Sequence, residues 1–195
     1  MKKIKSKEKI NVTYDTLSIK QIESQLKSEK YKEKYLKLLK STVYGLIIVA
    51  AVASILATLI MPVLEVNTSS MKPTFNENDI VLALKTKNIK AGDVIAFYHG
   101  NKILVKRVIA SSGNYVDIDE EGNVYINGYI INEPYVKEKI LGETDVEFPY
   151  QVPEGAYFVL SDDRSSSIDS RNSEIGCALE ENIIGKILIK VWPLK

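Results

Sequence analysis

Hydrophobic and polar positions follow two different patterns along this chain, and the change falls near residue 65. From Tyr44 to Leu64 the sequence carries no charge over 21 residues and is mostly aliphatic. As an α-helix, a segment of this length rises about 31 Å, which matches the hydrocarbon core of a bilayer. We interpret residues 41–64 as one transmembrane helix. The alternatives are a buried core helix, or the apolar region of a cleaved signal peptide, which is shorter and lies nearer the N-terminus.

Residues 1–40 precede this run and form a basic tail that we expect to be partly helical. Apolar residues recur at helical spacing at Ile19, Ile22 and Leu26, whereas residues 1–17 lack such a period and are expected to be disordered. The helical part is expected to be solvated, with contact to anionic lipid headgroups as the alternative.

Charge predicts the orientation of the span. The tail holds 12 lysines against 5 acidic residues, a net charge of +7, which leaves about −6 for the rest of the chain. Lysines beside a first span remain in the cytoplasm. The pattern therefore predicts a single-pass protein of the cell membrane with a cytoplasmic N-terminus and an extracytoplasmic domain over residues 65–195.

Beyond residue 65 the apolar residues recur with the period of β-strands. The segments are short, rich in β-branched and aromatic residues, and bounded by Gly, Asn or Asp. Within "YINGYI", Asn127-Gly128 is a strong signal for a two-residue hairpin turn. We expect one mainly β domain. The predicted strands are Asp79–Leu84, Gly92–Tyr98, Lys102–Ala110, Tyr115–Asp119, Val124–Ile126, Tyr129–Ile131, Tyr157–Leu160 and Ile183–Val191.

The composition of the chain argues against several kinds of site in the outer domain. The chain holds one cysteine, Cys177, and one histidine, His99, so no internal disulfide can form and no metal-ligand spacing is present. The negative net charge of this part argues against nucleic acid as a partner. His99 stands at an expected turn between strands, where we interpret it as an exposed loop residue rather than a member of a Ser-His-Asp triad.

A lysine within an apolar strand is the unusual feature of this domain. In "KILVKRVIA", Lys106 has Leu104 and Val108 on its own face. Burial disfavours the ammonium form, and a neutral lysine can activate a serine nucleophile. The alternative is a lysine that reaches solvent from an edge strand. Arg107 stays charged and needs a carboxylate, which the polar stretch "SDDRSSSIDSR" can supply.

Four motifs in this order resemble those of the bacterial type I signal peptidases. They are "SSMKPTF", "GDVIAF", "ILVKRVI", and "SDDRSSSIDSR" followed by "IIGKI". The similarity extends from Val66 to the C-terminus and includes the preceding anchor, as in the single-span forms of Gram-positive bacteria. It implies a signal-peptidase-type β-sheet catalytic domain preceded by one transmembrane α-helix. The chain departs from the family pattern at Ser161-Asp162-Asp163, where Gly-Asp-Asn is usual.

The resemblance implies roles for individual residues. Ser70 matches the nucleophile, with the adjacent Ser69 as the alternative, and Lys106 matches the general base. Ser167 resembles the serine that orients this lysine. The resemblance implies acyl transfer to a serine and then to water, a mechanism that needs no cofactor and no metal.

Other matched residues are expected to support the site. Asp162 with Arg107, and Asp169 with Arg171, resemble structural acid-base pairs. Thr68 carries a hydroxyl where some signal peptidases have a serine that helps bind the oxyanion, so we predict that it donates a hydrogen bond there.

The implied function is that of a membrane-anchored serine endopeptidase. Its partners would be preproteins that carry N-terminal signal peptides, together with the lipid bilayer, and it would act near the secretion translocon. Ser70 follows Leu64 by six residues, at most about 20 Å of chain, which would hold the nucleophile near the outer face of the membrane.

Three alternatives remain from the residues alone. A penicillin-binding acyltransferase would use the Ser-x-x-Lys of Ser69 to Lys72, although Pro73 disfavours the helix that this motif needs. A sortase-like enzyme would use Cys177, His99 and Arg171. A non-catalytic, membrane-tethered binding module would use none of these side chains.

Overall fold

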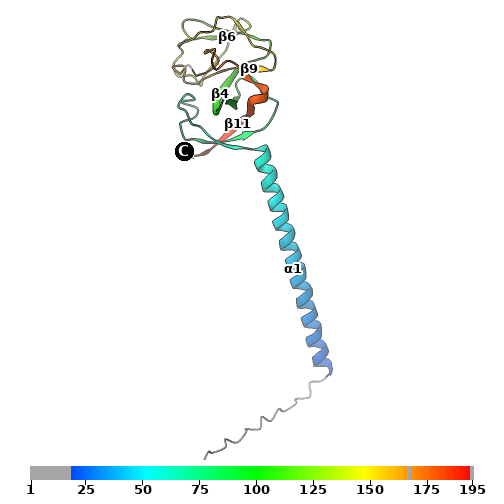
Figure 1. Cartoon of the computed structure of the whole chain (residues 1–195). Helices are drawn as coiled ribbons and strands as arrows, with labels where there is room; N and C mark the ends of the chain where they lie inside the picture. The colour runs from blue at the N-terminus through cyan, green and yellow to red at the C-terminus, as the bar shows by residue number, and fades with distance from the viewer. Residues whose placement is uncertain (1–18, 167, 194–195) are drawn as a thin grey trace, which may run out of the picture. The chain divides into compact units, whose positions relative to one another are not determined.

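The computed structural model describes residues 19–166 and 168–193 (Figure 1). This part of the chain divides into two units, and the division falls between Ala53 and Ser54. We describe each unit by itself.

Helix α1 spans Ile19–Ile60 and contains the apolar run. An 18-residue stretch of it has a mean hydropathy of 2.6 and none of that stretch is buried, so by length and composition α1 is able to cross a membrane. The helix ends four residues before the predicted boundary at Leu64. Pro62 explains this end, because proline disfavours a helical conformation at the residue before it and lacks an N–H to donate.

A larger antiparallel sheet lies in the second unit. Among the described residues it holds seven strands in the order β1-β2-β11-β3-β4-β9-β10. Figure 1 shows β4 beside β9, with β11 in the same sheet. The strands are β1 (Val63–Glu65), β2 (Ile80–Leu84), β3 (Val94–His99), β4 (Lys102–Ser111), β9 (Ala156–Leu160), β10 (Ala178–Leu179) and β11 (Ile183–Trp192).

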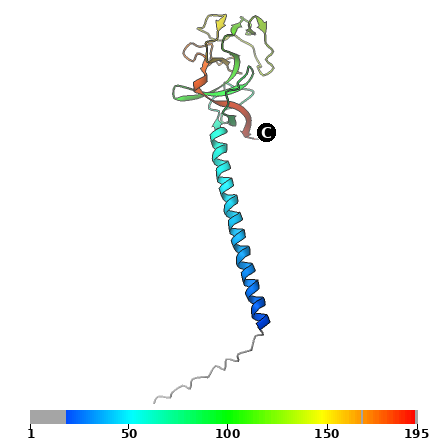
Figure 2. The same cartoon turned by 90° about the vertical axis from the view of Figure 1, so that its right-hand side faces the viewer.

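A smaller sheet of four strands, counted over the same described residues, has the order β7-β6-β5-β8. Figure 2 shows the fold turned by 90° from the view of Figure 1. The predicted hairpin is confirmed: β6 pairs with β7, and both turn residues, Asn127 and Gly128, have a positive φ, at 51° and 83°. The strands are β5 (Tyr115–Ile118), β6 (Val124–Ile126), β7 (Tyr129–Ile130) and β8 (Tyr150–Gln151).

The segment between β1 and β2 is held against the larger sheet by three buried apolar side chains. Val66, Met71 and Phe75 belong to one core cluster together with residues of β2, β3 and β4. Burying side chains of this size stabilises the fold by about 1.5–3 kcal/mol each. These anchors flank Ser70 and fix the backbone around it.

Strand β4 lies inside the larger sheet, between β3 and β9. In this register Lys106 stands opposite Ile95 of β3, and Arg107 stands opposite Leu160 of β9. Both cross-strand neighbours are apolar. Lys106 is buried and Arg107 is partly exposed, so β4 carries one cationic side chain fully into the interior. The fold is mainly β with one N-terminal apolar helix, as the sequence predicted.

Candidate active site

The hydroxyl of Ser70 and the amine of Lys106 meet in the interior of the β unit. Lys106 Nζ lies 2.7 Å from Ser70 Oγ, although the two residues are 36 positions apart in sequence. Only 5% of Ser70 and 1% of Lys106 are exposed. The neighbouring Ser69 is exposed instead, so the hydroxyl next to the amine is that of Ser70.

Burial changes the protonation of this lysine. Loss of solvation lowers the pKa of Lys106 to about 8, against the attraction of Asp169, which favours the charged form. An amine with this pKa is neutral in a useful fraction of molecules near neutral pH, and a neutral amine is able to accept a proton.

Two further hydroxyls contact this pair. Lys106 Nζ lies 2.9 Å from Ser161 Oγ, and Thr68 Oγ1 lies 2.9 Å from Ser70 Oγ. The backbone of Ser70 is held from the other side, because its carbonyl oxygen accepts a hydrogen bond of 3.0 Å from the N–H of Asp163. The loop after β9 thus touches both members of the pair.

Arg107 and Asp162 form a bidentate ion pair beside the site. Arg107 Nε donates to Asp162 Oδ1 at 2.8 Å, and Nη2 donates to Asp162 Oδ2 at 2.6 Å. The Tyr135 ring lies against the guanidinium, with 3.9 Å between its centroid and Cζ. The carboxylate side chain is fully buried, so this pair joins strand β4 to the loop after β9 in a water-poor environment.

Asp169 and Arg171 form a second buried pair at the far end of that loop. Arg171 Nε and Nη2 donate to the two carboxylate oxygens of Asp169 at 2.9 and 2.8 Å. Burial by itself would raise the pKa of Asp169, but the bonds from Arg171 outweigh it and hold that pKa below its usual value. Asp169 therefore stays ionised close to Lys106.

Comparison with known proteins places this chain in a family. The family model described as "Signal peptidase, peptidase S26" matches residues 36–192. The chain belongs to the signal peptidase family. A signal peptidase I of Bacillus licheniformis is 35% identical over 165 residues, which cover 75% of this chain and 86% of the relative. A signal peptidase I of Bacillus amyloliquefaciens is 29% identical over 179 residues, or 86% and 96% of the two chains.

The chain is also similar to a chloroplast protein of a plant and to a protein of known crystal structure. Thylakoidal processing peptidase 1 of Arabidopsis thaliana is 31% identical over 142 residues, which cover 64% of this chain and 40% of that longer protein. A crystal structure of a signal peptidase I from Enterococcus faecalis matches 54% of this chain and all of its own, with 28% identity and a TM-score of 0.45.

Membership of the signal peptidase family makes this chain a serine peptidase, a hydrolase. The structure brings together most residues that the motifs singled out. Thr68 and Lys106 both contact the hydroxyl of Ser70. The two expected ion pairs, Asp162 with Arg107 and Asp169 with Arg171, are both present. Ser167 lies outside the described residues, so its role stays a prediction.

Sequence reasoning missed other groups of this signal peptidase site. Ser161 was read only as a departure from Gly-Asp-Asn, yet its hydroxyl contacts Lys106. A buried ion pair between Glu133 and Arg164 was not predicted. Arg164 Nε also donates to the carbonyl oxygen of Ser161 at 3.0 Å. Glu133 and Arg164 are 31 positions apart in the sequence, and no local sequence pattern relates them.

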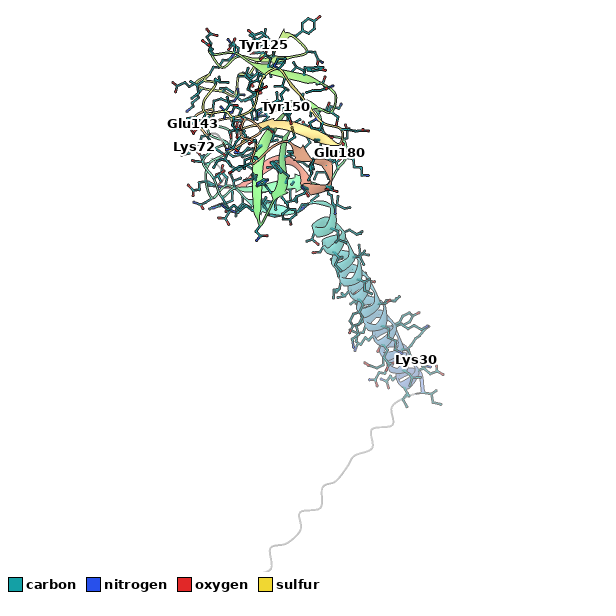
Figure 3. The ribbon with its side chains drawn as sticks, turned by 45° about the horizontal axis from the view of Figure 1, so that its top comes forward. Lys30, Lys72, Tyr125, Glu143, Tyr150 and Glu180 are labelled. Carbon is teal, nitrogen blue, oxygen red and sulfur yellow. The ribbon has the colours of Figure 1, made fainter. Side chains whose placement is uncertain are left out.

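The rival enzyme sites are not favoured by this geometry. Lys72, labelled in Figure 3, is exposed, whereas the lysine in contact with Ser70 is Lys106. Cys177 packs beside a core cluster, and burial raises the pKa of its thiol despite bonds from Tyr150 and Ser170. A raised pKa disfavours the thiolate that a sortase-like enzyme needs.

Within the described ranges 19–166 and 168–193, no three His, Cys, Asp or Glu side chains are grouped as ligands of one ion. The charged groups near the amine are instead used in ion pairs and in hydrogen bonds to the loop that follows β9.

Proposed function

We propose that this protein is a membrane-anchored endopeptidase that removes N-terminal signal peptides from exported preproteins, with Ser70 as nucleophile and Lys106 as general base. The observation that carries this proposal is the 2.7 Å contact between a buried lysine amine and a serine hydroxyl in a chain of the signal peptidase family. The lowered pKa of Lys106, about 8, suits a base that works near neutral pH.

In the first half of the reaction, neutral Lys106 takes the proton of the Ser70 hydroxyl as Oγ attacks the carbonyl carbon at the cleavage site. The C–N bond of the resulting tetrahedral intermediate then breaks. The proton held by Lys106 passes to the leaving amine of the mature protein, and the signal peptide remains attached to Ser70 as an ester.

In the second half, water hydrolyses this ester. Lys106, again neutral, takes a proton from the water as its oxygen attacks the ester carbonyl, and the proton is returned to Ser70 Oγ when the ester bond breaks. The signal peptide leaves with a new carboxylate. Both halves use the same amine, so one buried base is sufficient for the whole cycle.

The oxyanion of each tetrahedral intermediate needs donors that are already in place. The backbone N–H of Ser70 supplies one. The hydroxyl of Thr68, 2.9 Å from Ser70 Oγ, is placed to supply the second once Ser70 bonds to the substrate. In that state the Thr68 hydroxyl would donate its hydrogen to the oxyanion that forms beside it.

Membrane anchoring would bring the nucleophile to its substrate. Ser70 follows the end of α1 by ten residues, at most about 35 Å of extended chain. That end is tied to the sheet, because the N–H of Lys85 donates to the carbonyl oxygen of Ile60 at 2.9 Å. A signal peptide keeps its apolar region in the bilayer, so its cleavage site and Ser70 would lie at similar depth.

The direction of insertion follows from charge. The lysine-rich tail is expected in the cytoplasm and the β unit outside, in a cell membrane. The substrates would be preproteins emerging from the secretion translocon, close to which we expect the enzyme to act.

The test is cleavage of a purified preprotein by the detergent-solubilised full chain, with N-terminal sequencing of the product. We expect one cut at the end of the signal peptide and no cut in the mature form of the same protein. The Lys106→Ala variant should leave the preprotein intact. Cleavage of the mature form at many sites would instead indicate general proteolysis and would contradict the proposal.

A further inference from the structure

Ser161 gives the amine of Lys106 a second hydroxyl partner. Its Oγ lies 2.9 Å from Lys106 Nζ, and the residue is fully buried. At this position the chain departs from the Gly-Asp-Asn of the motif, so the motif resemblance assigns no role to a side chain here. In this chain a hydroxyl oxygen therefore lies against the base, and its effect on the base follows from how the hydroxyl is held.

The loop after β9 fixes Ser161 from three sides. Its backbone N–H donates to Asp169 Oδ2 at 2.9 Å, and its carbonyl oxygen accepts from Arg164 Nε at 3.0 Å. A hydrogen bond from the Ser161 side chain is also one of the causes that hold the pKa of Asp169 below its usual value. An ionised carboxylate only accepts, so in this bond the hydroxyl hydrogen of Ser161 points to Asp169.

Asp169 is itself immobilised. Arg171 donates to both of its oxygens, and both side chains are at most 1% exposed. Because both oxygens of this buried carboxylate accept hydrogen bonds from Arg171, the carboxylate is held in one orientation. A hydroxyl that donates to it is therefore held in one orientation as well. The oxygen lone pairs of Ser161 then face Lys106.

This arrangement limits what the amine of Lys106 can do. A neutral amine has two N–H groups and one lone pair. Because the hydroxyl hydrogen of Ser161 is used on Asp169, Ser161 Oγ accepts an N–H from Lys106. Ser161 therefore does not take the lone pair, which stays free to accept the proton of the other hydroxyl neighbour, Ser70 Oγ, 2.7 Å from Nζ.

We propose that Ser161 is a positioning residue, which takes one N–H of Lys106 and so aims the lone pair of the amine at the hydroxyl of Ser70. The proposal rests on the proposed function of the Ser70–Lys106 pair. Ser161 neither gains nor loses a proton: the proton of Ser70 moves to Lys106 Nζ, and Ser161 Oγ accepts a hydrogen bond before and after that transfer.

A second effect concerns the protonated state. The charged groups that act on Lys106 are Asp169, Arg171, Asp162 and Asp163. When Lys106 becomes an ammonium, the oriented oxygen of Ser161 stabilises it, since a hydrogen bond from a charged donor is stronger than one from a neutral donor. Removing this oxygen should lower the pKa of Lys106 while the four charged groups stay in place.

The test is the pH dependence of preprotein cleavage by the full chain with Ser161→Ala. We expect kcat to fall about 10- to 100-fold. KM should change little, because Ser161 is fully buried and out of reach of a substrate bound at the surface. The acidic limb of the kcat profile should also move to lower pH. Ser161→Gly should behave in the same way, which excludes the added methyl group as the cause. Ser161→Thr, which keeps a hydroxyl, should recover part of the loss.

Ser165→Ala is the matched control, because Ser165 lies in the same loop and its hydroxyl bonds to Asp163 at the surface. It should keep the parental kcat and pH profile. An unchanged kcat and profile in Ser161→Ala would overturn the proposal. So would a lower kcat that comes with a lower melting temperature and an unmoved acidic limb, which is the result of a structural role.

Failure of this inference is distinguishable from failure of the proposed function. If Ser70→Ala is inactive while Ser161→Ala matches the parent, the Ser70–Lys106 pair stands and the positioning role of Ser161 is wrong. If Ser70→Ala still cleaves the preprotein, the proposed function itself is wrong, whatever Ser161→Ala does.

Discussion

The amine of Lys106 lies in the protein interior with a serine hydroxyl on two sides. The burial of Lys106 was predictable from the sequence, because its neighbours in strand β4 are apolar. The hydroxyl of Ser161 was not predictable in the same way. It is 55 positions away in sequence, and the residue stands in a polar loop where a serine is unremarkable.

The protonation of Lys106 gives a prediction at the residue scale. Below the lowered pKa of about 8 the amine is an ammonium and cannot accept a proton, so cleavage should rise with pH through this value. Lys106→Arg should be inactive, because a guanidinium keeps its proton. Lys102→Arg, an exposed lysine of the same strand, is the control and should keep its activity. A substantially active Lys106→Arg variant would rule out the general base assigned here.

Thr68 gives a second prediction. Thr68→Val has nearly the same shape but lacks the hydroxyl, and loss of one oxyanion donor costs about 10²–10³ in kcat. KM should change little, because the donor acts on the transition state. Thr68→Ser should keep most of the activity. Parental turnover by the valine variant would show that Thr68 only supports the local turn.

At the scale of elements, periodicity located the strands well where they are long and apolar. β4 and β11 were found almost in full, and the Asn127-Gly128 turn defined the hairpin of β6 and β7. Three strands were missed, and each has only two or three residues, too few to show a period. They are β1, β8 and β10.

The ion pair between Arg107 and Asp162 gives a prediction at this scale, because it joins β4 to the loop after β9. Asp162→Ala should leave a guanidinium whose side chain is only 11% exposed without its carboxylate, at a cost of about 3–5 kcal/mol of unfolding free energy. We expect both the melting temperature and the activity to fall.

Asp163→Ala is the matched control for this change. Asp163 is the neighbouring acid, and its carboxylate bonds to the exposed Ser165 rather than to a buried cation. Its melting temperature should stay near that of the parent. Equal melting temperatures for Asp162→Ala and the parent would mean that the pair contributes nothing to holding the loop on β4.

At the scale of the whole molecule, the sequence predicted an anchor and a β unit because these differ sharply in apolar pattern and charge. The chemistry of the β unit depends on contacts between residues that are distant in the sequence. One example is the ion pair of Glu133 with Arg164, the arginine that donates to the carbonyl oxygen of Ser161. Motif order located the principal side chains of the site. The partners that hold them came from the structure, since those partners are spread over distant segments.

Orientation in the membrane is the prediction that belongs to this scale. A protease added to intact cells that express the full chain should digest the β unit and a tag at the C-terminus. A tag at the N-terminus should survive until the membrane is opened, because the lysine-rich tail is expected inside. Digestion of the N-terminal tag in intact cells, with the C-terminal tag protected, would mean the opposite orientation.

The central claim is that the hydroxyl of Ser70 performs the cleavage. The most direct measurement is the rate of preprotein cleavage by the parent, by Ser70→Ala and by Ser69→Ala, purified side by side. Ser69 is the adjacent exposed serine, so the two variants delete the same atom one position apart. We predict that Ser69→Ala cleaves near the parental rate and that Ser70→Ala, still folded by its melting temperature, does not cleave. Cleavage by folded Ser70→Ala at the parental rate would contradict the account.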